Sequence, residues 1–379
     1  MGTVRSDDGV APTGAAPTLG LVLAGTALAA TFLPWTGGTP VVDVSAVDGS
    51  ALAAGLALVA TGTFALRRYG VLDRRVGSVV AGLFSVGVAG VALYRLLRPA
   101  VGGTTPEVGI GLPVAAVATF AAVFVAVADW LALPNDSLWM RVRGFGVAVL
   151  LGLLAIAASY AVAILFGSLA LPFGLNVRFS VTTVGSGLGL VLFTAGYLRY
   201  RDFDPTYVDI SWPDRHDAAV AVGGLVLLLV VLGGVGLAFD RLGVPTATSA
   251  IEERAAEMAN PVFLLALVPL SFVAIALGEE LVFRNVVQKY LYEDFSRRTA
   301  VLMASLAFGA VHFRQYADPN PVATLSTLFI VFTLSLVLGW LYYRTENLLV
   351  PIAVHGAFNA IQFAALYVQL TGGLSAYGL

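Results

Sequence analysis

Eleven stretches of the chain are apolar over about the length of a membrane-spanning helix, and this feature constrains the fold most. A bilayer core of about 30 Å needs about 20 apolar residues at a helical rise of 1.5 Å per residue. Backbone polar groups in lipid must bond internally, so such runs form helices. We predict an all-α, polytopic membrane helix bundle with about 11 transmembrane helices, at residues 18–35, 50–66, 76–94, 108–133, 144–167, 180–198, 218–239, 260–291, 299–313, 321–343 and 348–370.

Composition indicates a multi-pass protein of the cell membrane and excludes other classes. Of the 379 residues, 58% are hydrophobic and only 12% are charged, whereas soluble globular proteins carry about 25% charged residues. The net charge of -2, without a basic cluster, argues against nucleic acid as a partner, so the lipid bilayer is the expected environment. The chain has no cysteine, which excludes disulfides, thiolate catalysis and cysteine-bound metals.

The distribution of basic residues predicts that the N-terminus lies inside and the C-terminus outside. Positively charged loops resist translocation, so they collect on the cytoplasmic side. If the eleven runs alternate from an inside N-terminus, 15 of the 21 Lys and Arg residues are cytoplasmic. These are Arg5, Arg67, Arg68, Arg74, Arg75, Arg141, Arg143, Arg199, Arg201, Arg215, Arg284, Lys289, Arg297, Arg298 and Arg344.

A polar, proline-containing connection, RYRDFDPTYVDISWPDRHD at residues 199–217, separates the sixth and seventh apolar runs. Such composition is typical of a connection between domains. We therefore predict an N-terminal transmembrane helical domain of unknown role at residues 1–206 and a second domain at residues 207–379. His216 falls in this connection and is expected to be a solvated loop residue.

Charged residues interrupt the apolar run at 260–291, where each one costs about 2.5 to 3.5 kcal/mol on insertion scales. Glu280 and Arg284 are four residues apart, so they lie on one helix face in the favourable order. Glu279 points about 100° away and has no partner in its own helix, so it can face the bundle interior and accept a proton from water. The alternative interpretation is a solvated helix end at the cytoplasmic surface.

Two further apolar runs place imidazole groups in the membrane. His312 follows Phe308 by one helical turn, and His355 and Asn359 share a helix face because they are four positions apart. If these helices begin or end near residues 291, 299 and 348, the helical rise gives overlapping depths of about 10 to 20 Å for these groups and Glu279. A hydrogen-bonded core histidine and interhelical hydrogen bonding are the structural alternatives. The shared depth favours one common site.

The three motifs, in this order, resemble the CPBP family of CAAX-protease and bacteriocin-processing intramembrane proteases, which includes the CAAX prenyl endopeptidases. They read Glu-Glu-x-x-x-Arg, Phe-x-x-x-His and His-x-x-x-Asn, and the resemblance covers about residues 207–379. It implies that Glu279 is the general base that activates water, with the help of His312, and that His355 and Asn359 stabilise the oxyanion. Glu280, Arg284 and Phe308 would support the site.

The resemblance leaves the cofactor open, because members are called metalloproteases while a glutamate mechanism without metal has also been argued. Glu279, His312 and His355 form a candidate ligand set for a divalent metal such as Zn²⁺, with one position left for water. The sequence contains no HExxH motif. It departs from the family pattern at Asn285, where members usually have glycine.

We therefore expect an intramembrane endopeptidase whose site opens toward the cytoplasm. Its expected substrates are membrane-anchored proteins or peptides, with CAAX-type prenylated proteins as one class. A proton- or ion-coupled transporter is the alternative, because a buried carboxylate and imidazoles can also relay protons or bind an ion. A catalytically inactive immunity or scaffold protein of the same fold is a third interpretation. The sequence leaves the oligomeric state open.

Overall fold

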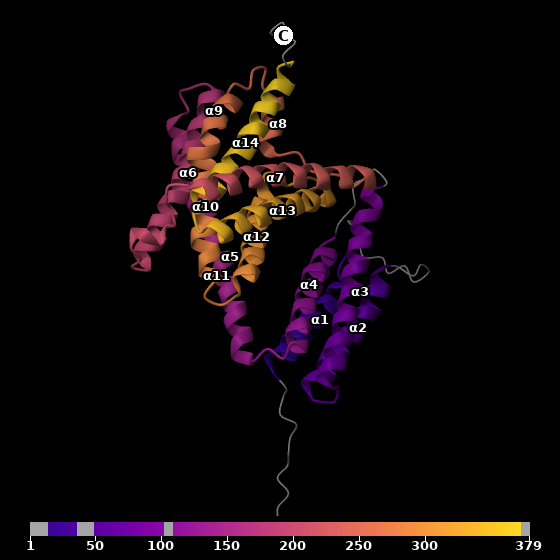
Figure 1. Ribbon diagram of the computed structural model, residues 1–379. Coiled ribbons are helices and arrows are strands. Elements are labelled where there is room, and N and C mark those ends of the chain that lie inside the picture. Colours follow the sequence, from indigo (N-terminus) through magenta and orange to yellow (C-terminus); the bar gives the residue numbers. More distant parts are fainter. Residues whose placement is uncertain (1–13, 36–48, 102–108, 373–379) are drawn as a thin grey trace, which may run out of the picture. The chain divides into compact units, whose positions relative to one another are not determined.

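The computed structural model describes residues 14–35, 49–101 and 109–372, which form an all-α protein (Figure 1). Within these ranges, nine helices are long and apolar enough to cross a membrane. The chain is therefore a multi-pass membrane protein. The nine helices are α2 (Gly49–Arg68), α3 (Arg74–Val101), α4 (Gly111–Trp130), α5 (Asn135–Leu169), α6 (Leu175–Tyr200), α7 (Arg215–Leu242), a continuous helix Phe263–Leu291, α13 (Pro321–Thr345) and α14 (Leu349–Leu370).

The other two predicted spans are helices that are short for a bilayer. Helix α1 (Ala15–Ala30) has 16 residues and α12 (Arg297–Val311) has 15, so each extends about 22 to 24 Å at 1.5 Å per residue. The total of eleven spans and the N-inside orientation thus stay predictions. Arg5, one of the residues behind that orientation, lies outside the described residues.

The chain divides into two compact units inside α5, and the first comprises residues 1–142 and 319–322. Helices α1 to α4 pack together there, with the buried ring of Phe64 against Gly20. Asp129 of α4 accepts hydrogen bonds of 2.9 and 3.1 Å from Arg67 of α2, which neutralises a carboxylate inside an apolar helix. The predicted boundary at residue 207, where the C-terminal domain is expected to begin, stays a prediction.

The second unit, residues 143–318 and 323–379, contains all the residues of the candidate site. Helices α6, α9 (Phe263–Leu270) and α14 rise together in Figure 1, whereas α7 and α13 run across the view, so the two groups diverge. They meet in a core cluster that includes Leu228 of α7, Leu338 of α13 and Phe358 of α14. The short helix α8 (Ala250–Ala256) connects the end of α7 to α9.

Helix Phe263–Leu291 widens on both sides of its glutamates. It runs through α9, the π-helical segment η2 (Ser271–Ala276), α10 (Leu277–Glu280), the π-helical segment η3 (Leu281–Gln288) and α11 (Lys289–Leu291). Pro269 lacks an N–H and cannot continue the regular ladder, and Ser271 Oγ donates to the carbonyl of Leu267 at 2.7 Å. Such π-turns occur often at functional sites because they reorient side chains.

Glycines allow α6 and α14 to approach this helix closely. A β-carbon added at Gly187 of α6 would lie 2.5 Å from the carbonyl oxygen of Ala274, and one at Gly356 of α14 would lie 2.5 Å from the Phe272 ring. Both distances are shorter than real β-carbon contacts. The close approach places α6 and α14 against the turn that carries Glu279.

We expect Gly187→Ala to destabilise the protein, because the new methyl group meets backbone that cannot move aside. Overpacking of this kind costs about 1–3 kcal/mol. Gly196→Ala in the same helix is the matched control, since nothing lies within 4 Å of its added β-carbon. Thermal unfolding in detergent checks this: equal melting temperatures for the two variants would contradict the close packing at Gly187.

The segment between α6 and α7, residues 201–214, is held across the ends of three helices. The carboxylate of Asp209 accepts hydrogen bonds of 3.0 and 3.1 Å from Lys289 Nζ and another from the hydroxyl of Tyr342. Its backbone N–H donates to Asn285 Oδ1 at 3.3 Å, and its carbonyl accepts from the N–H of Leu348 at 2.7 Å. Asn285, which departs from the family pattern, therefore contributes one hydrogen bond to this connection.

We expect Asp209→Asn to lower stability by about 1.5–3 kcal/mol, the range for hydrogen bonds to charged groups. The amide oxygen of asparagine can still accept a hydrogen bond from Lys289, but the ion pair with its ammonium group is lost. Asp202→Asn is the control, because its carboxylate is 86% exposed and, among the described residues, its ion pair is with the similarly exposed Arg199. We expect this variant to lose at most about 0.5 kcal/mol of stability. Comparable losses in chaotrope unfolding of both variants would show that Asp209 does not hold the connection.

Candidate active site

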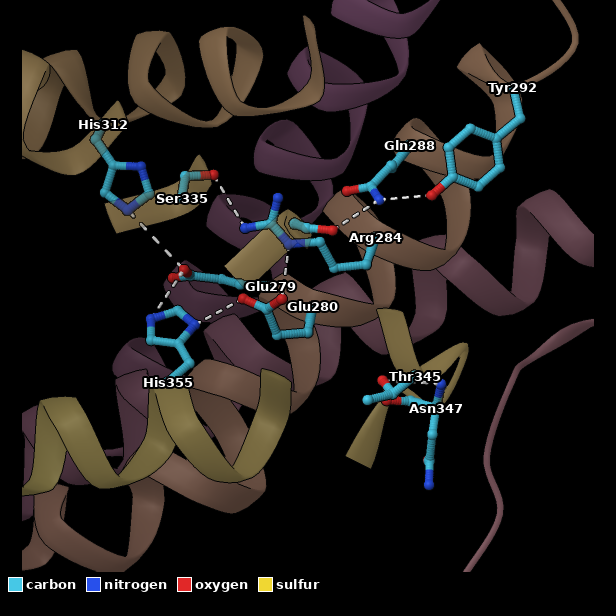
Figure 2. Close-up of polar contacts among 11 residues, drawn as sticks. Glu279, Glu280, Arg284, Gln288, Tyr292, His312, Ser335, Thr345, Asn347 and His355 are labelled. Atoms are coloured by element: carbon cyan, nitrogen blue, oxygen red, sulfur yellow. Dashed lines mark hydrogen bonds and ion pairs between the residues drawn. The ribbon is translucent and has the colours of Figure 1, made fainter. Parts of the chain in front are cut away.

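A buried ion pair anchors the site. Glu280 Oε2 lies 2.8 Å from Arg284 Nε, and both side chains have no exposed surface. The pair predicted from the i,i+4 spacing is therefore present, and the alternative of a solvated helix end is wrong for these two residues. Arg284 also donates to Ser335 Oγ of α13 at 3.0 Å (Figure 2). Its guanidinium lies over the Phe308 ring.

Glu280, which precedes His355 by 75 residues in the chain, also forms a hydrogen bond with it. Glu280 Oε1 lies 2.8 Å from His355 Nδ1. Because a carboxylate only accepts, this nitrogen carries a proton, and the contact fixes the ring orientation as carboxylate–histidine pairs do. The other ring nitrogen, Nε2, then faces Glu279 Oε2 at 3.9 Å (Figure 2).

His312 approaches Glu279 from the far end of α12. Its Nδ1–H donates to the carbonyl of Phe308 at 2.7 Å, and its Nε2 lies 3.9 Å from Glu279 Oε2. The helix becomes a 3₁₀ turn, η4 (His312–Tyr316), at this residue. The Phe308 ring packs against both imidazoles, with centroids at 4.5 Å from His312 and 6.2 Å from His355.

These groups line a cavity of about 750 Å³, which we call the chamber. Glu279, His312, His355 and Asn359 all line it. The Glu279 side chain is 20% exposed, unlike fully buried Glu280. Asn359 lies one turn beyond His355 on α14 and has no hydrogen-bond partner among the described residues, so its amide is free to bind a group in the chamber. The structure thus brings the four predicted residues together.

The candidate metal ligands have suitable chemistry but unsuitable spacing. In a tetrahedral Zn²⁺ site with bonds of about 2.0–2.1 Å, neighbouring ligand atoms lie about 3.3–3.4 Å apart. Both imidazole nitrogens lie 3.9 Å from the Glu279 carboxylate. In the described part of the chain, the only three such ligand atoms within 4.8 Å of one another belong to Asp214, His216 and Asp217, at the start of α7. The site residues do not fit a bound ion as they lie.

Several residues that support the site are not part of the three sequence motifs. Ser335 bonds Arg284, and Gln288 Nε2 donates to Tyr292 and to the carbonyl of Gly339 at 2.7 and 3.1 Å. A single serine in an apolar helix carries no local signal. Gln288, however, follows Arg284 by four residues, and that spacing could have indicated a continuous polar face.

The fold and site define a multi-pass membrane protein with a buried carboxylate–imidazole centre. Residues 261–361 match the family described as "Type II CAAX prenyl endopeptidase Rce1-like", so the chain contains an Rce1-like domain of the CPBP family there, and the resemblance predicted from the motifs is confirmed. All three motifs fall within the matched range. Comparison with curated proteins and with solved structures returned no match.

Proposed function

We propose that this protein is an intramembrane endopeptidase that hydrolyses peptide bonds of membrane-associated proteins. One observation carries the proposal: the Glu279 carboxylate faces the Nε2 atoms of both His312 and His355, at 3.9 Å each, and all three residues line the chamber. A gap of this length exceeds a direct hydrogen bond and suits a bridging water. The Rce1-like domain over residues 261–361 supports the same activity.

Glu279 acts as the general base in the proposed reaction. Its carboxylate takes a proton from the water, whose oxygen attacks the carbonyl carbon of the scissile bond. The carbon–nitrogen bond then breaks, and Glu279 returns the proton to the leaving amine. His312 positions the water, because its Nδ1–H is engaged with Phe308 and its Nε2 can accept a hydrogen bond.

His355 and Asn359 stabilise the negative oxygen that forms during attack. The Asn359 amide donates directly. His355 donates through Nε2–H in its doubly protonated form, because Nδ1–H is already directed to Glu280. The negative charge of Glu280 favours that form, so Glu280 is a positioning residue that acts through His355. Donors aimed at such an oxygen typically contribute about 10²–10³-fold in rate.

The substrates follow from the location of the site and from the family. A chamber inside a multi-pass protein admits segments that the membrane delivers, and the matched family is named for CAAX prenyl proteins. We propose membrane-anchored proteins or peptides as substrates, with prenylated CAAX-type proteins as one candidate class.

Purified protein incubated with a panel of membrane-anchored substrates, followed by mass spectrometry of the products, tests the proposal. We expect cleavage at defined peptide bonds. Intact substrates across the whole panel, combined with proton- or ion-coupled uptake into vesicles, would replace the protease with a transporter. Intact substrates and no uptake would favour an inactive scaffold.

A further inference from the structure

Helices outside the matched range supply part of the chamber wall. Helices α5, α6, α7 and α8 all precede residue 261, where the match begins, and each of them contributes lining residues. Those from α6 are Arg178, Phe179, Thr182, Thr183 and Ser186. The family match does not describe these residues, so their role in the chamber has to follow from their own chemistry.

Helix α6 presents a row of polar side chains to the chamber. Arg178, Thr182 and Ser186 are spaced by four positions each, so they share one helix face. The Ser186 hydroxyl lies 2.7 Å from the hydroxyl of Ser159 in α5 and is thereby engaged. The Thr182 hydroxyl and the Arg178 guanidinium form no hydrogen bond or ion pair with the described residues. These two groups are therefore free to contact a molecule bound in the chamber.

Arg178 is the only lysine or arginine among the described residues that line the chamber, and its side chain is exposed. Two carboxylates line it as well, but neither forms an ion pair with Arg178 in the described part of the chain. Glu252 accepts from the Ser249 N–H at 2.8 Å in the cap of α8, and Glu279 faces the two imidazoles. The guanidinium thus offers an unpaired positive charge in the chamber, beside apolar lining that strengthens electrostatic attraction.

Helix α6 runs alongside the helix that holds the general base, and this contact gives the distance to Arg178. Phe179 stacks on Phe263, with ring centroids 4.9 Å apart. Further along, a β-carbon added at Gly278, the residue before the general base, would lie 3.0 Å from Leu190 Cβ. Arg178 precedes Leu190 by twelve positions, which is about 18 Å along the helix.

This distance matches a short extended peptide. Such a chain spans at most about 3.3–3.6 Å per residue, so about 18 Å corresponds to about five residues. The side chains of Arg178 and Glu279 both extend into the chamber, which shortens the span to about three to five residues. A segment whose scissile carbonyl lies at Glu279 can therefore reach Arg178 within a few residues, and Thr182 lies between them for a hydrogen bond to its backbone.

We propose that Arg178 is a specificity-determining residue that binds a carboxylate of the substrate, about three to five residues from the scissile bond. The planar guanidinium can pair with both carboxylate oxygens at once. The carboxylate belongs either to the C-terminus of the substrate or to an Asp or Glu side chain, and the test below distinguishes these two sources. The proposal rests on the proposed endopeptidase function.

Binding to the Glu279→Gln variant tests the proposal without cleavage. The probes are fluorescent, membrane-anchored peptides of one sequence that contains no acidic residue. One peptide ends in a carboxylate and one in an amide, and a third set ends in an amide with a single glutamate at successive positions. Fluorescence anisotropy in detergent gives the dissociation constants. We expect at least one carboxylate-bearing peptide to bind about 10-fold more tightly than the neutral amide, as for a hydrogen bond to a charged group.

Substitutions at position 178 assign this preference to the guanidinium. We expect Arg178→Gln to remove it and Arg178→Lys, which keeps the charge but not the planar fork, to retain part of it. Arg241→Gln is the matched control, because Arg241 is an exposed arginine of α7 that does not line the chamber. With Glu279 intact, Arg178→Gln should raise KM for the preferred peptide and leave kcat nearly unchanged, since the contact is present before and during the reaction.

Each outcome decides the question. Tighter binding of the peptide with a free C-terminus identifies the terminal carboxylate, and tighter binding of glutamate-containing peptides alone identifies an acidic side chain. Equal affinities for all peptides, no binding of any peptide, or a preference that persists in Arg178→Gln would overturn the proposal. An equal loss in Arg241→Gln would attribute the preference to overall surface charge and overturn it as well. Intact substrates with the unmutated protein would instead reject the proposed hydrolysis, which the binding measurement does not require.

Discussion

Glu279→Gln is expected to lower kcat/KM for peptide cleavage by at least about 10²–10⁴-fold, the range for loss of a general base. The amide matches the carboxylate in shape but cannot take a proton from water. Glu279 is partly exposed to the chamber and has no direct hydrogen bond in the structure, so folding should be retained. Initial cleavage rates for the purified variant, with its melting temperature measured in parallel, check both expectations.

Glu252→Gln is the matched control for this loss, because Glu252 also lines the chamber but belongs to the cap of α8. Its carboxylate accepts from the Ser249 N–H at 2.8 Å, and glutamine can fill the same position in a capping box. We expect nearly unchanged cleavage. If Glu279→Gln cleaved as fast as Glu252→Gln, Glu279 would not be the base and the proposed mechanism would be wrong.

Local spacing predicted the parts of the site that lie within one helix. The spacing of four positions from Glu280 to Arg284, and from His355 to Asn359, places each pair on one helix face, since helical geometry is the same in any surroundings. Hydrophobic runs likewise predicted the membrane helices, because the thickness of the bilayer sets their length. The runs at 18–35 and 299–313 correspond to shorter helices, and no periodicity marks where α12 becomes the 3₁₀ turn at His312.

Contacts between different helices cannot be predicted from the spacing of residues within one helix. The Glu280–His355 hydrogen bond, the Ser335 contact with Arg284 and the Asn285 contact with Asp209 each join residues more than 50 positions apart. Such pairs depend on which helix faces meet, and that depends on close approaches such as the one at Gly187. Spacing within one helix therefore pairs Glu280 with Arg284 alone, whereas the structure shows that its carboxylate binds both Arg284 and His355.

Arg284→Met is expected to destabilise the protein by about 3–5 kcal/mol, because it leaves Glu280 as a buried charge without its main counterion. Both side chains are fully buried, and Met fills most of the space of the arginine stem. A lower melting temperature in detergent and a lower midpoint of chaotrope unfolding measure the effect. Arg254→Met, which removes the exposed pair with Glu257, should cost under about 1 kcal/mol.

The double variant Glu280→Gln/Arg284→Met separates the charge from the packing. Removing both ions leaves no uncompensated buried charge, so most of the lost stability should return. Cleavage should stay low, since a neutral amide at position 280 no longer favours doubly protonated His355 at the oxyanion. A double variant as unstable as Arg284→Met alone would show that the guanidinium acts through its contacts with Ser335 and the Phe308 ring, and not by neutralising Glu280.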